Sequence, residues 1–146
     1  MVINSKKTSL TNRKFGKNER LCSKKIIGNL FLSGTVVKKF PFKLIYGCDN
    51  SGRTPVKVLV SVPKKIHRRA TQRNFIRRKI REAYRLKKHV LYEVAEMGRG
   101  TLNIIIIYTA SNVYTYAEIE KKIEKILVEL VEKLKENSNF SAGDAD

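Results

Sequence analysis

Acidic residues and cysteines are scarce in this sequence of 146 residues. Thirteen Asp and Glu residues stand against 31 Lys and Arg residues, which gives a formal net charge of +18. A single domain with such an excess repels itself and is expected to bind a polyanion, either a nucleic acid or an anionic membrane surface. Cys22 and Cys48 form no CxxC motif and no cluster with histidine, so neither a disulfide framework nor a zinc site is expected.

Long hydrophobic runs are also missing. The longest uninterrupted apolar run, Ile104 to Tyr108, is far shorter than the ~20 residues that a membrane-spanning helix needs. The first residues contain no apolar segment that could act as a signal peptide. We therefore expect a cytoplasmic protein whose partner is a nucleic acid and not a membrane.

The positive charge is concentrated in one segment. Residues 64–88 carry twelve basic side chains and a single acidic one, Glu82, and thus hold more than half of the net charge. A solvated helix usually carries acidic partners at i,i+4 spacing, and this segment has almost none. Arginine outnumbers lysine between Arg68 and Arg85, and its planar guanidinium suits bidentate contacts with phosphate. The segment is the candidate nucleic-acid surface.

The hydrophobic pattern predicts one α+β domain of the split βαβ type with the element order α-β-β-α-β-α. Helices are predicted over 17–31, 70–96 and from 115 onward, and strands over 40–46, 56–62 and 102–108. The first two strands flank a turn-rich segment and should pair as an antiparallel hairpin. The third is so continuously apolar that it should lie inside the sheet. We expect 1–14 to form a disordered basic arm, 15–136 the domain and 137–146 a flexible tail.

The predicted helix over 70–96 has two different faces when residues are placed at 100° intervals. One face is apolar and should pack on the core: it holds Ile76, Ile80, Ala83, Tyr84, Val90, Leu91 and Val94. The adjoining stripe is basic and polar and should bind: it holds Arg73, Asn74, Arg77, Arg78, Arg81, Arg85 and Lys88. The last helix should begin at a capping box formed by Thr115 and Glu118.

RNA is favoured over DNA as the partner. The basic segment is not accompanied by a helix-turn-helix, a zinc finger or a heptad zipper. RNA-binding proteins commonly add aromatic side chains on which unpaired bases stack. Five aromatic residues lie on or beside the predicted sheet, and most of them should belong to the core: Phe31, Phe40, Phe42, Tyr46 and Tyr108.

The sequence contains no evident catalytic constellation. His67 and His89 lie among cations with no obvious partner, so a structural or phosphate-contacting role is expected for each. The acidic residues that could hold two metal ions for phosphodiester cleavage lie mainly in the last helix, interleaved with lysine. The chain alone should not cleave RNA.

The basic segment and the strand before it form a long spaced motif. It runs from Val60-Ser61-Val62-Pro63-Lys64-Lys65 through Arg68-Arg69-Ala70 to Arg73-Asn74-Phe75-Ile76-Arg77-Arg78-Lys79-Ile80-Arg81-Glu82. This motif resembles the signature of the protein subunit of bacterial ribonuclease P, and the segment 17–34 resembles the first helix of that family. Only the first dozen residues and the tail lie outside the resemblance. Phe75 stands where the signature usually has a basic residue.

The resemblance implies an RNA-based enzyme, ribonuclease P, which removes the 5′ leader of precursor tRNA by hydrolysis. A large RNA subunit holds the active site and its Mg²⁺ ions, and the small protein assists it without catalytic residues or metal ligands of its own. The implied fold is a single α+β domain with a small mixed sheet and a basic crossover helix, a split βαβ type like that of ribosomal protein S5. The implied partners are the ribonuclease P RNA and precursor tRNA, with no membrane and no small-molecule substrate.

The resemblance also implies two sets of binding residues. The first contacts RNA through the signature helix and the loop before it: Lys64, Lys65, Arg69, Arg73, Asn74, Arg77, Arg78 and Arg81. The second lines a cleft between the first helix and the sheet that accepts the single-stranded leader: Ile27, Phe31, Lys43 and Ile45. The alternative function is a structural RNA-binding protein of the ribosome, and a third is a DNA-compacting protein.

Overall fold

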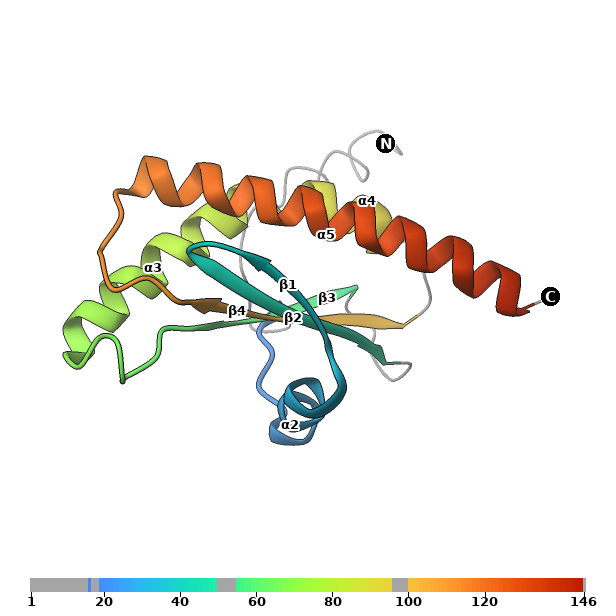
Figure 1. The fold of residues 1–146 in the computed structure, drawn as a ribbon, viewed down its shortest axis with the longest axis horizontal. Coiled ribbons are helices and arrows are strands. Elements are labelled where there is room, and N and C mark those ends of the chain that lie inside the picture. Colours follow the sequence, from blue (N-terminus) through green and yellow to red (C-terminus); the bar gives the residue numbers. More distant parts are fainter. Residues whose placement is uncertain (1–15, 17–18, 50–54, 96–99, 146) are drawn as a thin grey trace.

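A computed structural model of the chain describes residues 16, 19–49, 55–95 and 100–145. The helices pack against one mixed sheet in an α+β arrangement (Figure 1). In chain order the elements are α2 (Lys24–Ser33), β1 (Thr35–Lys39), β2 (Phe42–Asp49), β3 (Val56–Ser61), α3 (Ala70–Lys87), α4 (His89–Ala95), β4 (Thr101–Tyr108) and α5 (Tyr116–Ala145).

The four-stranded sheet is mixed and has the order β1-β2-β4-β3. β2 pairs antiparallel with both β1 and β4, whereas β3 and β4 are parallel neighbours. Parallel neighbours need a crossover connection, and α3 and α4 provide it between β3 and β4. The small mixed sheet and the basic crossover helix implied by the resemblance are therefore confirmed.

The predicted hairpin between 40–46 and 56–62 is wrong. The strands exist as β2 and β3, but β4 lies between them in the sheet. β4 is buried on both faces, and a strand with two apolar faces takes a central position even when its neighbours in the sheet follow each other in the sequence. The antiparallel partner of β2 at the edge is β1, a strand that the sequence did not predict because only Val37 of its five residues is buried.

The sheet separates two cores of unequal size. Helices α3, α4 and α5 cover one face, and α2 lies on the other (Figure 1). Alternate residues of β4 serve both faces, since Ile104 and Ile106 belong to the main core and Ile105 to the small core beneath α2. The small core consists of Leu21, Leu30, Ile45 and Ile105.

The first helix begins later than predicted. Ser23 caps α2 by accepting a hydrogen bond from the Ile26 amide at 3.3 Å, so the helix starts at Lys24 and not near residue 17. The residues before it run beside β3, where the Leu21 amide donates to the Val58 carbonyl at 3.0 Å. At the other end, Gly34 allows an abrupt entry into β1, because a Cβ there would lie 2.5 Å from the Leu30 carbonyl oxygen.

The other two predicted helices differ from the structure at their ends. The segment predicted as one helix over 70–96 divides into α3 and α4 at Lys88. The capping box of α5 is confirmed, since the Glu118 amide donates to Thr115 Oγ1 and Thr115 Oγ1 donates to Glu118 Oε1 at 2.9 Å. α5 continues to Ala145, so the backbone of 137–145 is helical. The flexibility of 137–146 and the domain boundaries stay predictions, and the arm at 1–14 lies outside the described residues.

Candidate RNA-binding surface

The loop between β3 and α3 carries the first basic residues of the signature. Its turn is closed by hydrogen bonds from the Ile66 and His67 amides to the Pro63 carbonyl. His67 is buried beneath the loop, where its Nε2 lies 2.8 Å from the Ala110 carbonyl and its Nδ1 lies 2.9 Å from Gln72 Nε2. A proton on Nε2 satisfies both contacts, because the ring then donates to the carbonyl and accepts from the amide. Of the two roles expected for His67, structural or phosphate-contacting, its burial and these two contacts support the structural one.

Arg73 ties this loop to the first turn of α3. Its Nη1 donates to the His67 carbonyl at 2.9 Å and to the Arg68 carbonyl at 2.7 Å. Both carbonyls belong to the loop that presents Lys64, Lys65 and Arg69, which are all exposed. Arg73, which the resemblance places in the RNA contact set, therefore also positions the other members of that set.

Along α3, residues at i, i+4 and i+7 form the exposed stripe that periodicity predicts. Asn74, Arg78 and Arg81 lie on it and are exposed. Arg77 lies beside this stripe and is half-buried. Its Nη2 donates to the side-chain oxygen of Asn74. This bond leaves the amide NH₂ of Asn74 available as a donor. The buried side of the same helix is Ile76, Ile80, Ala83 and Tyr84, as predicted.

The stripe forms one wall of an open groove of about 410 Å³. Asn74, Arg78 and Arg81 line it, but the loop residues Lys64, Lys65 and Arg69 do not. The remaining lining residues are Arg20, Glu82 and Arg85. Sequence reasoning missed Arg20 because it assigned this residue to the first helix. The structure instead places Arg20 in a parallel bridge with Val58, at the edge of the sheet nearest to α3.

Cations crowd one another around Arg81. Partial burial lowers the pKa of Arg81, and the neighbouring Arg20 and Arg77 lower it further. Within the described part of the chain, neither Arg78 nor Arg81 has a carboxylate at ion-pair distance. Clustered guanidinium groups repel one another, so an anion bound between them lowers the free energy of the arrangement.

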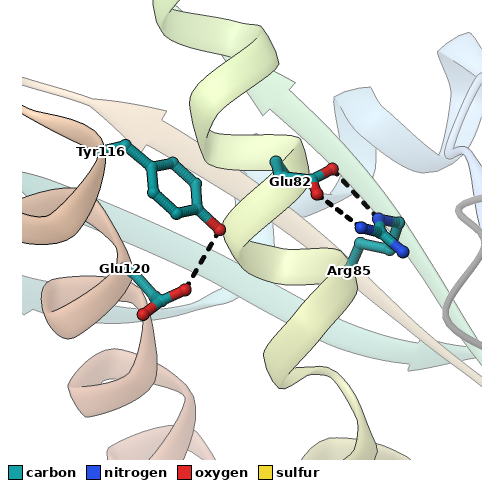
Figure 2. A network of polar contacts seen from close by, with 4 residues as sticks. All are labelled: Glu82, Arg85, Tyr116 and Glu120. Atoms are coloured by element: carbon teal, nitrogen blue, oxygen red, sulfur yellow. Dashed lines mark hydrogen bonds and ion pairs between the residues drawn. The ribbon is translucent and has the colours of Figure 1, made fainter.

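Glu82, the acidic residue within the basic segment, is occupied by its neighbour. The Arg85 guanidinium donates to both carboxylate oxygens of Glu82 (Figure 2). The distance is 3.0 Å from Nε to Oε2 and 2.5 Å from Nη2 to Oε1. The hydrogen bonds from Arg85 lower the pKa of Glu82. The ion pair with Glu82 offsets the charge of Arg85. The uncompensated positive charge that α3 contributes to the groove therefore comes from Arg78 and Arg81. Tyr116 donates to Glu120 on α5 beside this pair, at 3.1 Å.

Lys88 does not belong to the binding stripe, contrary to the prediction. Its side chain is buried, and its Nζ lies 2.6 Å from Glu19 Oε1. Tyr92 donates its hydroxyl to the same oxygen. Burial alone would raise the pKa of Glu19, but hydrogen bonds from Lys88, Tyr92 and the Gly16 amide bring it below its ordinary value. The helix breaks at this residue, so the periodicity that placed Lys88 on the stripe does not hold there.

The residues of the proposed leader cleft differ in accessibility. Phe31 on α2 is 57% exposed, and Lys43 on β2 is half-buried on the sheet face that α2 covers. Ile27 packs at the edge of the small core, and Ile45 is 4% exposed within it. Phe31 and Lys43 can therefore contact a ligand, whereas Ile45 is part of the small core and Ile27 packs against that core. Of the aromatic residues considered above, Phe42, Tyr46 and Tyr108 are buried as expected, and Phe40 is exposed.

Among the described residues, no group of three or more His, Cys, Asp or Glu side chains is arranged to hold a metal ion. None of the described helices combines the length and the apolar character that crossing a bilayer demands.

Comparison with known proteins identifies the family. Residues 15–131 match the family model described as Ribonuclease P. The ribonuclease P protein component of Porphyromonas gingivalis is 31% identical over 115 residues, which cover 78% of this chain and 84% of that protein. The component of Chlorobium phaeobacteroides is 37% identical over 98 residues, 64% of this chain and 67% of its own.

Solved structures agree with this match at the level of the fold. The ribonuclease P protein of Staphylococcus aureus has a TM-score of 0.58 at 23% identity, covering 77% of this chain and 94% of its own. That of Thermotoga maritima has a TM-score of 0.59 at 21% identity, covering 75% of this chain and 94% of its own. The family model and the curated relatives favour the ribonuclease P assignment over the ribosomal alternative. The chain belongs to the family of ribonuclease P protein components.

Proposed function

We propose that this chain is the RNA-binding protein subunit of ribonuclease P and assists a catalytic RNA in removing the 5′ leader from precursor tRNA. The observation that carries the proposal is the row of arginines on α3 that faces a groove. Among the residues that the structure describes, Arg78 and Arg81 have no carboxylate at ion-pair distance. This surface, together with Lys64, Lys65 and Arg69 on the preceding loop, contacts the ribonuclease P RNA.

The contribution of the protein is electrostatic and positional. The RNA subunit and its substrate are both polyanions and repel each other at ordinary salt. Lysine and arginine side chains that neutralise phosphates release counterions, and this release drives association. Arg73 contributes by holding the loop carbonyls of His67 and Arg68, which fixes the direction in which the loop cations point.

The leader contacts a second surface, beside α2. Phe31 is exposed there and offers a face on which an unpaired base can stack, and Lys43 supplies a cation for the backbone. Binding of the leader adds affinity that mature tRNA lacks, so the holoenzyme prefers substrate over product. This assignment rests on the family resemblance, on the exposure of Phe31 and on the partial exposure of Lys43.

The Mg²⁺ ions that the reaction needs are assigned in this proposal to the RNA subunit, and the protein to the cytoplasm. Both assignments rest on the family resemblance. The residues of this chain serve to bind and orient RNA, and none is assigned a step in the hydrolysis.

Reconstitution tests the proposed function. The chain is combined with a bacterial ribonuclease P RNA and precursor tRNA at low Mg²⁺, and formation of the trimmed tRNA with a 5′-phosphate is followed. We expect cleavage with both components and none with the protein alone. Co-sedimentation with a ribosomal subunit without any stimulation of cleavage would instead support the ribosomal alternative.

A further inference from the structure

A largely buried ion pair joins two distant parts of the chain. The side chains of Lys88 and Glu19 are only 7% and 14% exposed, and their charged atoms lie 2.6 Å apart. Removing one partner of such a pair leaves the other charge buried without compensation, so the two side chains stay together and fix the position of Glu19 relative to Lys88. Tyr92 adds a hydrogen bond to the same carboxylate oxygen. Glu19 is therefore fixed against the junction of α3 and α4.

The residues after Glu19 are fixed on the opposite side. Arg20 forms a parallel bridge with Val58, and the Leu21 amide donates to the Val58 carbonyl. The Leu21 side chain is buried in the small core. The backbone of Arg20 therefore lies between two fixed points: the preceding residue, Glu19, is paired with Lys88, and Arg20 itself bridges Val58 of the sheet. The side chain of Arg20 is exposed.

This arrangement brings Arg20 to the groove from the wall opposite α3. Arg20 lines the groove together with Asn74, Arg78 and Arg81, and its charge is close enough to Arg81 to lower the pKa of that residue. Guanidinium groups that converge from two walls match the several oxygens of a phosphodiester, which accepts hydrogen bonds from more than one direction. The amide NH₂ of Asn74 supplies a neutral donor at the same place.

We propose that Arg20, Arg78 and Arg81 together bind one backbone phosphodiester of RNA, and that the Glu19–Lys88 ion pair is the anchor that positions Arg20 for this contact. The inference rests on the proposed function, because the phosphodiester belongs either to the ribonuclease P RNA or to precursor tRNA. Arg20 is the binding residue, and Glu19 and Lys88 are positioning residues.

The first experiment compares Arg20→Ala with Lys121→Ala, which removes one exposed cation from α5, away from the groove. The Kd for a bacterial ribonuclease P RNA is measured over a series of KCl concentrations. We expect Arg20→Ala to weaken binding about tenfold, as for the loss of a charged hydrogen bond. The slope of log K against log salt should fall by about 0.7–0.9, and Lys121→Ala should change neither quantity.

A second arm identifies the source of the phosphodiester. The holoenzyme is assembled with each variant at saturating protein, and its Kd for precursor tRNA is measured. A defect confined to the RNA subunit assigns the phosphodiester to that subunit, and a defect confined to precursor tRNA assigns it to the substrate. Wild-type affinity and salt dependence in both arms would overturn the inference. If Arg78→Ala and Arg81→Ala weakened RNA binding in that case, the proposed function would stand although the inference about Arg20 had failed.

The anchor is tested by double-mutant analysis. Glu19→Gln should weaken RNA binding about as much as Arg20→Ala, and adding Arg20→Ala to Glu19→Gln should cost little more. Glu124→Gln is the matched control, since it removes an exposed carboxylate 3.2 Å from Lys87. The double variant Glu19→Gln/Lys88→Met removes both buried charges and should recover stability but not RNA affinity. Arg20→Ala can also be added to Glu19→Gln or to Glu19→Gln/Lys88→Met. If it then weakened RNA binding as much as it does in the wild type, Arg20 would not need the ion pair for its contact.

Discussion

Helices α3 and α5 are built alike toward the core and differently toward solvent. Both pack on the same face of the sheet and against each other (Figure 1). Ile80 on α3 and Ile123 on α5 are each fully buried in the main core. On its outer side, α5 interleaves lysine with glutamate, whereas the outer stripe of α3 carries arginine with Glu82 as its acidic residue.

This comparison shows which property of a helix indicates binding. Amphipathic periodicity is the same in both helices and reports only that each covers a core. The difference lies in charge compensation, because mixed charges support an isolated surface and charges of one sign destabilise it unless a partner is bound. The apolar and the polar side of each helix can be altered separately by substitution.

The largest effects are expected on the apolar sides, where the helices should behave alike. Ile80→Ala and Ile123→Ala should each lower the free energy of unfolding by about 2–5 kcal/mol, because each leaves a cavity in the main core. Urea denaturation followed by circular dichroism measures the loss. Under conditions where both variants remain folded, their RNA affinity should equal that of the wild type. A selective loss of binding by Ile80→Ala would mean that the two sides of α3 are not independent.

The polar sides should behave differently. Arg78→Ala/Arg81→Ala should weaken binding to ribonuclease P RNA about 100-fold, from two charged contacts of about 1.4 kcal/mol each. Lys121→Ala/Lys125→Ala removes the same charge from exposed positions on α5 and should have almost no effect. Filter binding at matched salt provides the measurement. Equal losses from the two pairs would show that net charge alone, and not its placement on α3, determines affinity.

Features set by local periodicity could be predicted from the sequence. The buried side of α3, the central position of β4 and the Thr115 cap of α5 each depend on residues within a few positions of one another. The eight RNA-contact residues came from the motif, and the structure brings Asn74, Arg78 and Arg81 into one groove.

Features set by distant partners could not be predicted. Lys88 would lie on the basic stripe if α3 continued, but the helix ends one residue earlier and the side chain turns toward Glu19, 69 positions away in the sequence. Arg20 reaches the groove through a bridge to Val58, which no periodicity within 17–31 reveals. The prediction of an antiparallel hairpin was wrong for the same reason. The turn-rich sequence after 40–46 is a local signal, and the insertion of β4 between β2 and β3 is not.

Arg73 separates charge from geometry within α3. Arg73 donates both bonds from Nη1, whose two N–H groups are held in the guanidinium plane, whereas the N–H groups of a lysine ammonium rotate. Arg73→Lys keeps the charge but loses this fixed geometry toward the His67 and Arg68 carbonyls, so it should weaken RNA binding about fivefold, or about 1 kcal/mol. The salt slope should stay unchanged, in contrast to Arg78→Ala. Cleavage assays with Arg73→Ala should show a larger loss at low Mg²⁺ than at high Mg²⁺. An equal loss at every Mg²⁺ concentration would contradict the positional role.

The smallest effect is expected from the acidic residue of the groove. Glu82→Gln should strengthen RNA binding about twofold, because it removes a negative charge from the groove wall and releases Arg85 from its ion pair. The same change on α5, Glu124→Gln, should leave RNA affinity unaltered, and a decrease with Glu82→Gln would mean that the Glu82–Arg85 pair itself shapes the binding surface.

Glu82→Gln should also lower the stability of the fold, and this loss should be larger at neutral pH than in acid. Because the pKa of Glu82 is lowered by Arg85, its ion pair stabilises the folded protein above the ordinary pKa of glutamate, and the contribution disappears as the pH falls through the lowered pKa. The pair is exposed and screened by solvent, so its contribution at neutral pH should be small. Urea titrations of wild type and Glu82→Gln should therefore differ slightly at neutral pH and coincide in acid. A difference that persisted in acid would have to come from contacts other than the charge.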